Sequence, residues 1–237
     1  MCGRSSLTKT EKELEARFNA TFYSDELERY NPLPSFNVAP THFHPVITNV
    51  EQNHIRLFRW GLIPNWAKDT KIGYKMINAR KETITEKNAF KYALKQKRCL
   101  VPMDGFYEWK KLGKNKQPYY IRTIDQEIFC CAGLWEVWQS PRDEVVESFT
   151  IITQEPNSML KDIHDRMPAI LLHEQEELWL DDSIPPEELL NMITPYPQEL
   201  MEAYPVANRV GKVSENDVDL LKRVPPIENI QQGDLFG

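Results

Sequence analysis

The 237-residue sequence lacks the long hydrophobic runs that mark membrane proteins. No apolar stretch approaches the ~18 consecutive residues needed to span a bilayer. The first residues, Met1 to Arg4, contain no apolar segment, so we expect no secretory signal. These absences favour a cytoplasmic protein with no membrane partner.

Cysteine and glycine are also scarce. Four cysteines in a chain of 237 residues do not make a disulfide framework, and the absence of a Cys-x-x-Cys pair argues against a cysteine-based zinc site. The nine glycines form no Walker or dinucleotide-binding pattern, and the histidines have no partners at metal-ligand spacing. We therefore expect no metal and no other cofactor. Cys99, Cys130 and Cys131 lie in apolar, strand-like runs and are expected in the core.

Negative charge prevails, but it is distributed unevenly. The formal net charge is −6, yet residues 59–123 carry 16 Lys and Arg against 5 Asp and Glu. Residues 124–237 carry 7 against 23. A basic middle segment can form a local positive surface for a polyanion, although an exposed lysine-rich helix would have the same composition.

Aromatic residues accompany the basic segment. Trp60, Trp66, Phe106 and Trp109 offer surfaces on which unpaired bases can stack. Core packing is the competing interpretation, and we favour it for Trp60 and Trp109.

Local patterns predict short helices and short strands. Thr10 followed by Glu13 is a capping box, which predicts a helix ending near Asn19. Thr85 is expected to cap a helix over 86–97. Two further helices are expected at 174–180 and 186–193. The expected strands lie at 45–50, 55–60, 99–102, 106–110, 119–123, 128–135 and 148–153, with a turn over 111–117.

Helices and strands do not alternate regularly along the chain, which makes a parallel doubly wound sheet improbable. We predict an α+β fold, a single domain over residues 1–224 with a mainly antiparallel, barrel-like β core and peripheral helices. Residues 225–237 are expected to form a flexible C-terminal tail.

Cys2 has chemistry that an internal cysteine lacks. Aminopeptidases generally remove Met1 when the next side chain is small, which would leave an amine and a thiol on adjacent carbons. Their ordinary pKa values, about 8 and about 8.5, give each a reactive minor form near neutral pH. The amine can condense with an aldehyde and the thiolate can then close a thiazolidine ring, or the thiolate can serve in acyl transfer. A chance cysteine at position 2 is the alternative.

Three other segments place polar groups among apolar residues. Asn78 and Arg80 would share one side of an extended segment, where the guanidinium can bind a phosphate with two hydrogen bonds. Glu108 is flanked by aromatic residues, and burial would raise its pKa toward a range suited to proton transfer. His164 and Arg166 offer a proton donor and a second cation. Taken alone, each of these residues is more often structural than catalytic.

Six short motifs occur in order between Cys2 and about residue 210. They are Cys2-Gly3-Arg4, Asn37-Val38-Ala39-Pro40-Thr41, Arg59-Trp60-Gly61-Leu62-Ile63-Pro64, Asn78-Ala79-Arg80-Lys81-Glu82-Thr83, Gly105-Phe106-Tyr107-Glu108-Trp109 and His164-Asp165-Arg166-Met167-Pro168. Together they resemble the SRAP family (SOS response-associated peptidase), the abasic-site processing proteins of bacteria and eukaryotes. Six ordered motifs are far more specific than any single one.

The resemblance implies a protein that recognises abasic sites in single-stranded DNA. Its N-terminal Cys2 would form a stable thiazolidine crosslink with the aldehyde of the lesion and so shield it. Asn78 would hold the amino terminus or the sugar, and Glu108 would move protons during imine formation and ring closure. His164 would help open the sugar ring and take part in reversal. The family also implies a lyase activity by β-elimination and an autoproteolytic removal of Met1.

The resemblance further implies which residues contact DNA. Arg80 would bind phosphates, with Arg4 and Arg166 as further candidates, and Trp66 and Pro40 would complete the interface. The partner would be single-stranded DNA containing abasic sites. The family name suggests induction by DNA damage and association with the nucleoid during action. A monomer is our default expectation, independent of the resemblance.

The C-terminal residues predict a second partner. Gln232-Gly233-Asp234-Leu235-Phe236 resembles the peptide that binds the bacterial sliding clamp. Gln232, Leu235 and Phe236 match its anchor positions, whereas Gly233 replaces the preferred leucine and should weaken binding. An ordinary disordered end is the alternative.

Two other functions remain open at this point. The same Cys2, Glu108 and His164 would suit a cysteine peptidase of the N-terminal nucleophile kind, which would leave Arg80 and the basic segment unexplained. A non-catalytic module that binds single strands is the third possibility, in which Cys2 is incidental.

Overall fold

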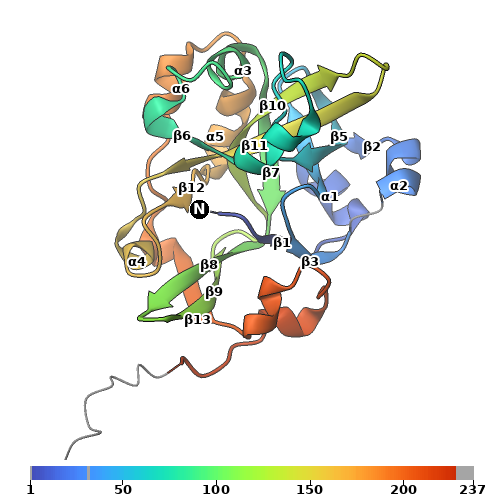
Figure 1. Ribbon diagram of the computed structural model, residues 1–237. Helices are drawn as coiled ribbons and strands as arrows, with labels where there is room; N and C mark the ends of the chain where they lie inside the picture. The colour runs from blue at the N-terminus through green and yellow to red at the C-terminus, as the bar shows by residue number, and fades with distance from the viewer. Residues whose placement is uncertain (1, 31–32, 228–237) are drawn as a thin grey trace, which may run out of the picture.

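A closed five-stranded β-barrel forms the centre of the computed structural model, which describes residues 2–30 and 33–227 (Figure 1). Its strands follow the order β5-β4-β7-β10-β11, and β11 returns to pair with β5. Neighbours are antiparallel except β11 and β5, which run parallel. The barrel strands are β4 (Phe43–Thr48), β5 (Glu51–Trp60), β7 (Arg98–Met103), β10 (Phe129–Gln139) and β11 (Val145–Gln154).

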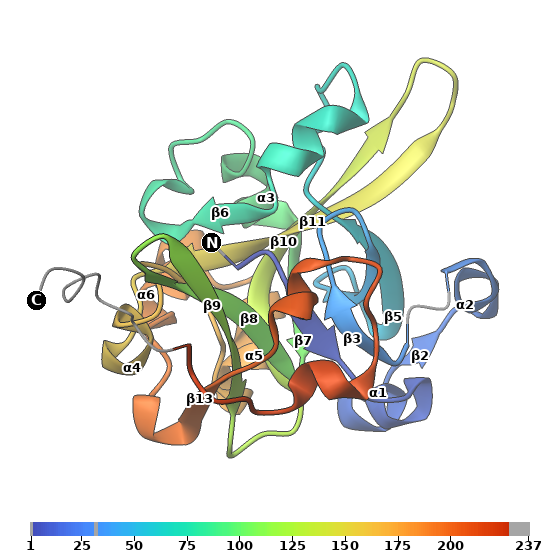
Figure 2. The same cartoon turned by 60° about the horizontal axis from the view of Figure 1, so that its bottom comes forward.

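A second, five-stranded sheet lies against the barrel in the order β13-β9-β8-β1-β3 (Figure 2). Its paired neighbours are antiparallel, and the hairpin of β8 and β9 is its longest part. Its strands are β1 (Ser5–Leu7), β3 (Ser35–Val38), β8 (Gly105–Leu112), β9 (Asn115–Thr123) and β13 (Met201–Pro205).

Three short strands extend the barrel walls. β6 and β12 lie beside β11, and β2 lies beside β5. They are β2 (Thr21–Phe22), β6 (Asn78–Arg80) and β12 (Met167–Pro168). β6 and β12 lie on the side of the barrel that faces the N-terminal segment and β8, and their residues are therefore close to the junction between the two sheets (Figure 1).

The helices are short and lie around the barrel. The α-helices are α1 (Glu11–Phe18), α2 (Ser24–Tyr30), α3 (Lys91–Gln96), α4 (Ser158–Lys161), α5 (His173–Leu180) and α6 (Pro186–Met192). The 3-10 helices are η1 (Thr70–Lys75), η2 (Lys81–Thr83), η3 (Gln198–Leu200), η4 (Asn208–Gly211) and η5 (Val218–Leu221). No helix of the described chain is long and apolar enough to cross a membrane.

The α+β prediction with a mainly antiparallel, barrel-like core is confirmed. The capping box at Thr10 is also present, since its side chain accepts from the Glu13 amide while the Glu13 carboxylate accepts from the Thr10 amide. Asn19 ends that helix in the left-handed conformation.

Three local predictions were wrong or incomplete. The helix expected over 86–97 is only α3, because turns occupy the preceding residues and Thr85 caps no helix. The turn expected over 111–117 is a two-residue connection at Gly113 and Lys114, where Gly113 takes a positive φ of 60°. The prediction also missed α2, whose sequence has little apolar periodicity.

Two large apolar clusters and one small one make up the core. Cys99, Cys130 and Cys131 are fully buried as free thiols, and Trp60 is 1% exposed, as predicted. Trp109 is only partly buried, but it packs against the small cluster, which agrees with the expected packing role. A side chain at position 105 would collide with Tyr120, which explains the glycine there.

Candidate active site

The N-terminal segment lies along β8, at the junction of the two sheets (Figure 1). β1 pairs with β8 through Ser5 and Phe106, and the Tyr107 amide donates a 2.9 Å hydrogen bond to the carbonyl of Arg4. Because of these bonds, the residues before Ser5 lie alongside the middle of β8. The Cys2 side chain is consequently fully buried, within the cluster formed between the barrel and the second sheet.

Asn78 holds the main chain of Cys2. It opens β6, which pairs in parallel with β11 through Asn78 and Ile151. The Asn78 side-chain amide donates a 2.8 Å hydrogen bond to the carbonyl oxygen of Cys2. The bond joins residues 76 positions apart, and it restricts how the N-terminal residue can move over β8.

Glu108 brings a carboxyl group into this apolar junction. It lies on β8, three residues after Gly105, and is 2% exposed. Burial raises the pKa of Glu108 to about 7, because the charged form loses its hydration. Burial, reinforced by the nearby Glu108, also raises the pKa of the Cys2 thiol above its ordinary range.

His164 approaches Glu108 from the loop between α4 and β12. Its Nε2 lies 3.8 Å from Oε2 of Glu108. The Arg166 amide donates a 3.1 Å hydrogen bond to Nδ1 of His164, which leaves the proton of the neutral ring on Nε2. The Asp165 carboxylate also lies 3.0 Å from Nδ1, but it is 84% exposed and therefore well hydrated. Partial burial lowers the pKa of His164, which favours the neutral ring at neutral pH.

The structure thus brings together the four residues predicted to be catalytic, Cys2, Asn78, Glu108 and His164. They come from the N-terminal segment, β6, β8 and the loop after α4, respectively. The arrangement combines a nucleophile, a carboxyl group that titrates near neutrality and a neutral imidazole, which are the parts of acid–base assisted covalent chemistry. Within residues 2–30 and 33–227, no cluster of His, Cys, Asp or Glu would hold a metal ion.

The three arginines predicted to bind phosphates occur in different settings. Arg80 lies at the exposed end of β6, and its guanidinium makes no hydrogen bond or ion pair with other described residues. Arg4 donates to the Asn37 side chain at 2.9 Å and is half-buried. Arg166 donates two hydrogen bonds, at 2.9 and 2.8 Å, to the Glu82 carboxylate. Arg80 is therefore the cation most available to a phosphate.

The remaining predicted DNA contacts lie outside this group of four residues. Trp66 is 58% exposed in the loop between β5 and η1, which Trp138 anchors through a hydrogen bond to the carbonyl of Ala67. Pro40 is partly exposed in the turn between β3 and β4. The predicted clamp-binding residues Gln232, Leu235 and Phe236 lie outside the described part of the chain.

One feature beside the catalytic group has no counterpart in the sequence analysis. A cavity of about 740 Å³ opens next to His164, between the end of β8 and the α4 region, with Trp109, Lys111 and Lys161 among its lining. The two sides are about 50 positions apart in the sequence. No local sequence pattern connects them, and the lining is of mixed charge, since Glu155, Asp162 and Asp165 lie there with the two lysines.

Comparisons with known proteins place this arrangement in a family. The family model described as SOS response associated peptidase (SRAP) matches residues 1–213. The chain belongs to the SRAP family. The matched region contains all four residues predicted to be catalytic and excludes the residues after 213.

Relatives of known name and structure agree with the SRAP assignment. The abasic site processing protein YoaM of Bacillus subtilis is 44% identical over 224 residues, which cover 93% of this chain and 97% of that protein. The abasic site processing protein HMCES of Xenopus tropicalis is 30% identical, over 94% of this chain and 78% of that protein. A crystal structure of a Bacteroides thetaiotaomicron protein superposes with a TM-score of 0.88 at 35% identity, covering 94% of this chain and 100% of that one.

Proposed function

We propose that this SRAP protein processes abasic sites in single-stranded DNA by forming a covalent crosslink through Cys2. One observation carries the proposal. The Asn78 side chain holds the Cys2 carbonyl by a hydrogen bond, and the buried Glu108 carboxyl beside Cys2 has a pKa of about 7. The names of its relatives point to the same lesion, because they are abasic site processing proteins from bacteria and vertebrates.

The proposed reaction begins with removal of Met1, by autoproteolysis or by an aminopeptidase. The freed amine of Cys2 attacks the aldehyde of the open-chain deoxyribose, and loss of one water gives an imine. The Cys2 sulfur then adds to the imine carbon, and the nitrogen takes up a proton. The product is a five-membered thiazolidine, formed from one aldehyde and one aminothiol with the release of one water.

Glu108 is the proton acceptor and donor of this sequence. The raised pKa of the Cys2 thiol means that the sulfur keeps its proton at neutral pH, so ring closure needs a base close by. A carboxyl group with a pKa of about 7 exists in both forms at that pH and can take the proton. Nε2–H of the neutral His164 ring, 3.8 Å from Glu108, can donate a hydrogen bond to the ring oxygen of the sugar, and the protonated form of Glu108 can supply the proton as the aldehyde opens.

DNA binding precedes this chemistry in the proposal. Arg80, two residues from Asn78, would hold a phosphate next to the lesion, with Arg4 and Arg166 lending positive charge nearby. Trp66 and Pro40 would contact the adjacent bases and sugars. Replacing Arg80 with alanine should weaken binding of abasic and intact single strands alike and reduce the salt dependence of binding by about one ion.

The decisive experiment is mass spectrometry of the intact protein, alone and after incubation with a single strand carrying one abasic site. We expect loss of Met1 and an adduct of the mass of protein plus DNA minus one water. Cys2→Ser should abolish the stable adduct and retain non-covalent binding. Cys99→Ala, a change at a buried cysteine outside the catalytic group, is the matched control and should retain the adduct.

The same imine allows strand cleavage by β-elimination, which is the lyase activity that the family resemblance implied. Cys2→Ser keeps the amine but lacks the sulfur that closes the ring. Gel analysis of the DNA should therefore show more strand cleavage, relative to crosslink, in this variant than in the wild type. A protein that lacks Met1 but forms no adduct with abasic DNA would contradict the proposal and favour the cysteine peptidase instead.

A separate proposal concerns the C-terminal tail. Its resemblance to a clamp-binding peptide would bring the protein to replication forks, through Gln232, Leu235 and Phe236. Deleting residues 231–237 should abolish retention on an immobilised bacterial sliding clamp and leave crosslinking unchanged. Equal retention of the truncated protein would refute this proposal without affecting the first.

A further inference from the structure

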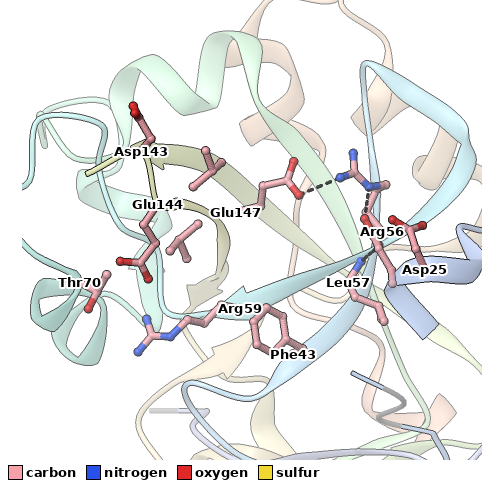
Figure 3. Close-up of a pocket in the computed structure, with 12 residues that line it drawn as sticks. Asp25, Phe43, Arg56, Leu57, Arg59, Thr70, Asp143, Glu144 and Glu147 are labelled. Atoms are coloured by element: carbon pink, nitrogen blue, oxygen red, sulfur yellow. Dashed lines mark hydrogen bonds and ion pairs between the residues drawn. The ribbon is translucent and has the colours of Figure 1, made fainter. Parts of the chain in front are cut away.

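A second large cavity, of about 970 Å³, lies between β5 and β11 (Figure 3). Its walls come from α2, β4, β5, η1 and the start of β11, and they include no residue of the candidate active site. In Figures 1 and 2, α2 and β2 lie across the barrel from the N-terminus. We refer to this cavity as the β5–β11 cleft.

The β5–β11 cleft exists because the barrel is closed by very few residue pairs. β11 and β5 pair only through Ser148 with Arg59 and Phe149 with Trp60. Before that point, Val145–Glu147 pairs with β10 on one edge, and no strand of the described chain lies along the other edge. Arg56–Phe58 of β5 is paired with β4 alone. Two strand edges therefore diverge without a strand between them.

The backbone polar groups of these edges face the cleft. The Ser140 amide donates a 2.8 Å hydrogen bond to the Glu144 carbonyl, so the backbone of Glu144 faces β10. Successive residues of a strand alternate, so the amide and carbonyl of Val145 face the cleft. On β5, the Leu57 amide donates at 2.8 Å to a carboxylate oxygen of Glu26 from α2. A side chain thus takes the place that the carbonyl of a neighbouring strand would occupy.

The charge of the cleft restricts what can bind there. Its lining contains five carboxylates and two arginines. Arg56 is already paired at 2.8 Å with both Glu26 and Glu147, and Figure 3 shows the pair with Glu147. The carboxylates of Asp143 and Glu144 are exposed at its outer end. Negative charge therefore excludes the DNA substrate from this face, and it excludes residues 225–237, which contain no Lys or Arg.

We propose that the β5–β11 cleft binds an extended, basic peptide segment of a partner protein. The segment adds as a strand along the open edge of β11 at Val145–Glu147, and its main chain pairs with the outward-facing groups of Val145. A lysine or arginine of the segment lies against Asp143 and Glu144. Its apolar side chains cover Val145, which is 57% exposed. Main-chain pairing and alternate side-chain contacts are the recognised basis of strand addition.

The test uses three synthetic hexapeptides as probes against the full-length protein. The first alternates lysine and valine, the second alternates glutamate and valine, and the third has the lysines of the first but proline in place of valine. We expect only the first to bind in fluorescence anisotropy. In nitrogen-15 correlation spectra it should shift the amides of Val145–Glu147 and leave that of Asn78 unmoved. Equal binding of the proline peptide would show that the cleft attracts positive charge without pairing to a strand, and it would overturn the proposal.

Variants separate strand pairing from charge. Val145→Pro removes an amide from the open edge without removing a hydrogen bond to β10, and it should weaken binding about fivefold. Glu144→Lys reverses an exposed carboxylate and should also weaken binding about fivefold. Glu188→Lys, an exposed carboxylate on α6, is the matched control and should bind normally.

Unchanged thermal midpoints would show that the variants fold, and unchanged affinity of folded Val145→Pro would refute strand addition. Sedimentation velocity of the protein without peptide identifies a competing occupant. A concentration-dependent dimer that Val145→Pro abolishes would show that a second copy of this chain fills the cleft.

Discussion

Replacing Glu108 with glutamine is expected to stabilise the protein at alkaline pH while it slows crosslinking. Burial raises the pKa of Glu108 from an ordinary value of 4.5 to about 7 in the folded state. The folded protein therefore binds a proton that the unfolded chain has released, and folding stability falls as pH rises from about 4.5 to about 7. The size of the shift corresponds to at most about 3 kcal/mol of unfolding free energy, lost by pH 8.

Glutamine has nearly the shape of the protonated carboxyl group and does not titrate. The difference in unfolding free energy between the Glu108→Gln variant and the wild type should therefore grow in favour of the variant by up to about 3 kcal/mol between pH 4 and pH 8. Urea denaturation of both proteins at several pH values measures this difference, and titrating groups that do not interact with Glu108 cancel in it. A difference that stays constant with pH would refute the assigned pKa.

The same variant tests the role of Glu108 in catalysis. The wild-type crosslinking rate should rise with pH through about 7, as the carboxylate form becomes populated. The variant should lose that rise and should be slower by about 10²- to 10⁴-fold. A variant that is stabilised but crosslinks at the wild-type rate would show that Glu108 is buried without being the proton carrier.

Three further substitutions test the construction of the site and the fold. Asn78→Ala removes the hydrogen bond to the Cys2 carbonyl, so it should slow crosslinking about tenfold with little change in DNA affinity. The crosslinking rate measured against DNA concentration separates the two, because its plateau reports the chemical step and its midpoint reports the affinity. Gly105→Ala should lower stability by about 1–3 kcal/mol in urea, because its methyl group collides with Tyr120, whereas Gly211→Ala, in open space, should not. Arg98→Lys should lower the free energy of unfolding by about 3 kcal/mol, because the buried guanidinium donates to several carbonyls that one ammonium cannot reach.

Parts of the fold that depend on local interactions were predictable from the sequence. The first helix was predicted because Thr10 and Glu13 satisfy each other's backbone amides within four residues. The helix over 86–97 was predicted too long, because only Lys91–Gln96 is helical. The turns before α3 still bring Phe90 against the same apolar cluster that contains Leu94, as a continuous helix would. Local propensity does not distinguish a continuous helix from turns followed by α3 when both bury the same apolar side chains.

The four residues predicted to be catalytic show the same difference between what the sequence predicts and what the tertiary structure decides. The sequence singled out Cys2, Glu108 and His164 by residue type, and the family resemblance implied the role of Asn78 beside them. Their meeting depends on the pairing of β1 with β8 and of β6 with β11, which joins residues as much as 76 positions apart. The raised pKa of Glu108 also arises from burial at the junction of two sheets, which a strand pattern alone does not reveal.

The sequence by itself determined the class of fold, the order of the motifs and the chemistry available at Cys2, because these depend on side-chain identity and short-range spacing. Only the tertiary structure decided which cations remain available: Arg80 is exposed, whereas Arg166 is held by Glu82. Only the tertiary structure showed the β5–β11 cleft, because an unpaired strand edge is a property of which strands lie side by side. Contacts between segments distant in the sequence determine which side chains are buried, which charges are paired and how well each is hydrated. These properties decide whether reactive residues act together at one site.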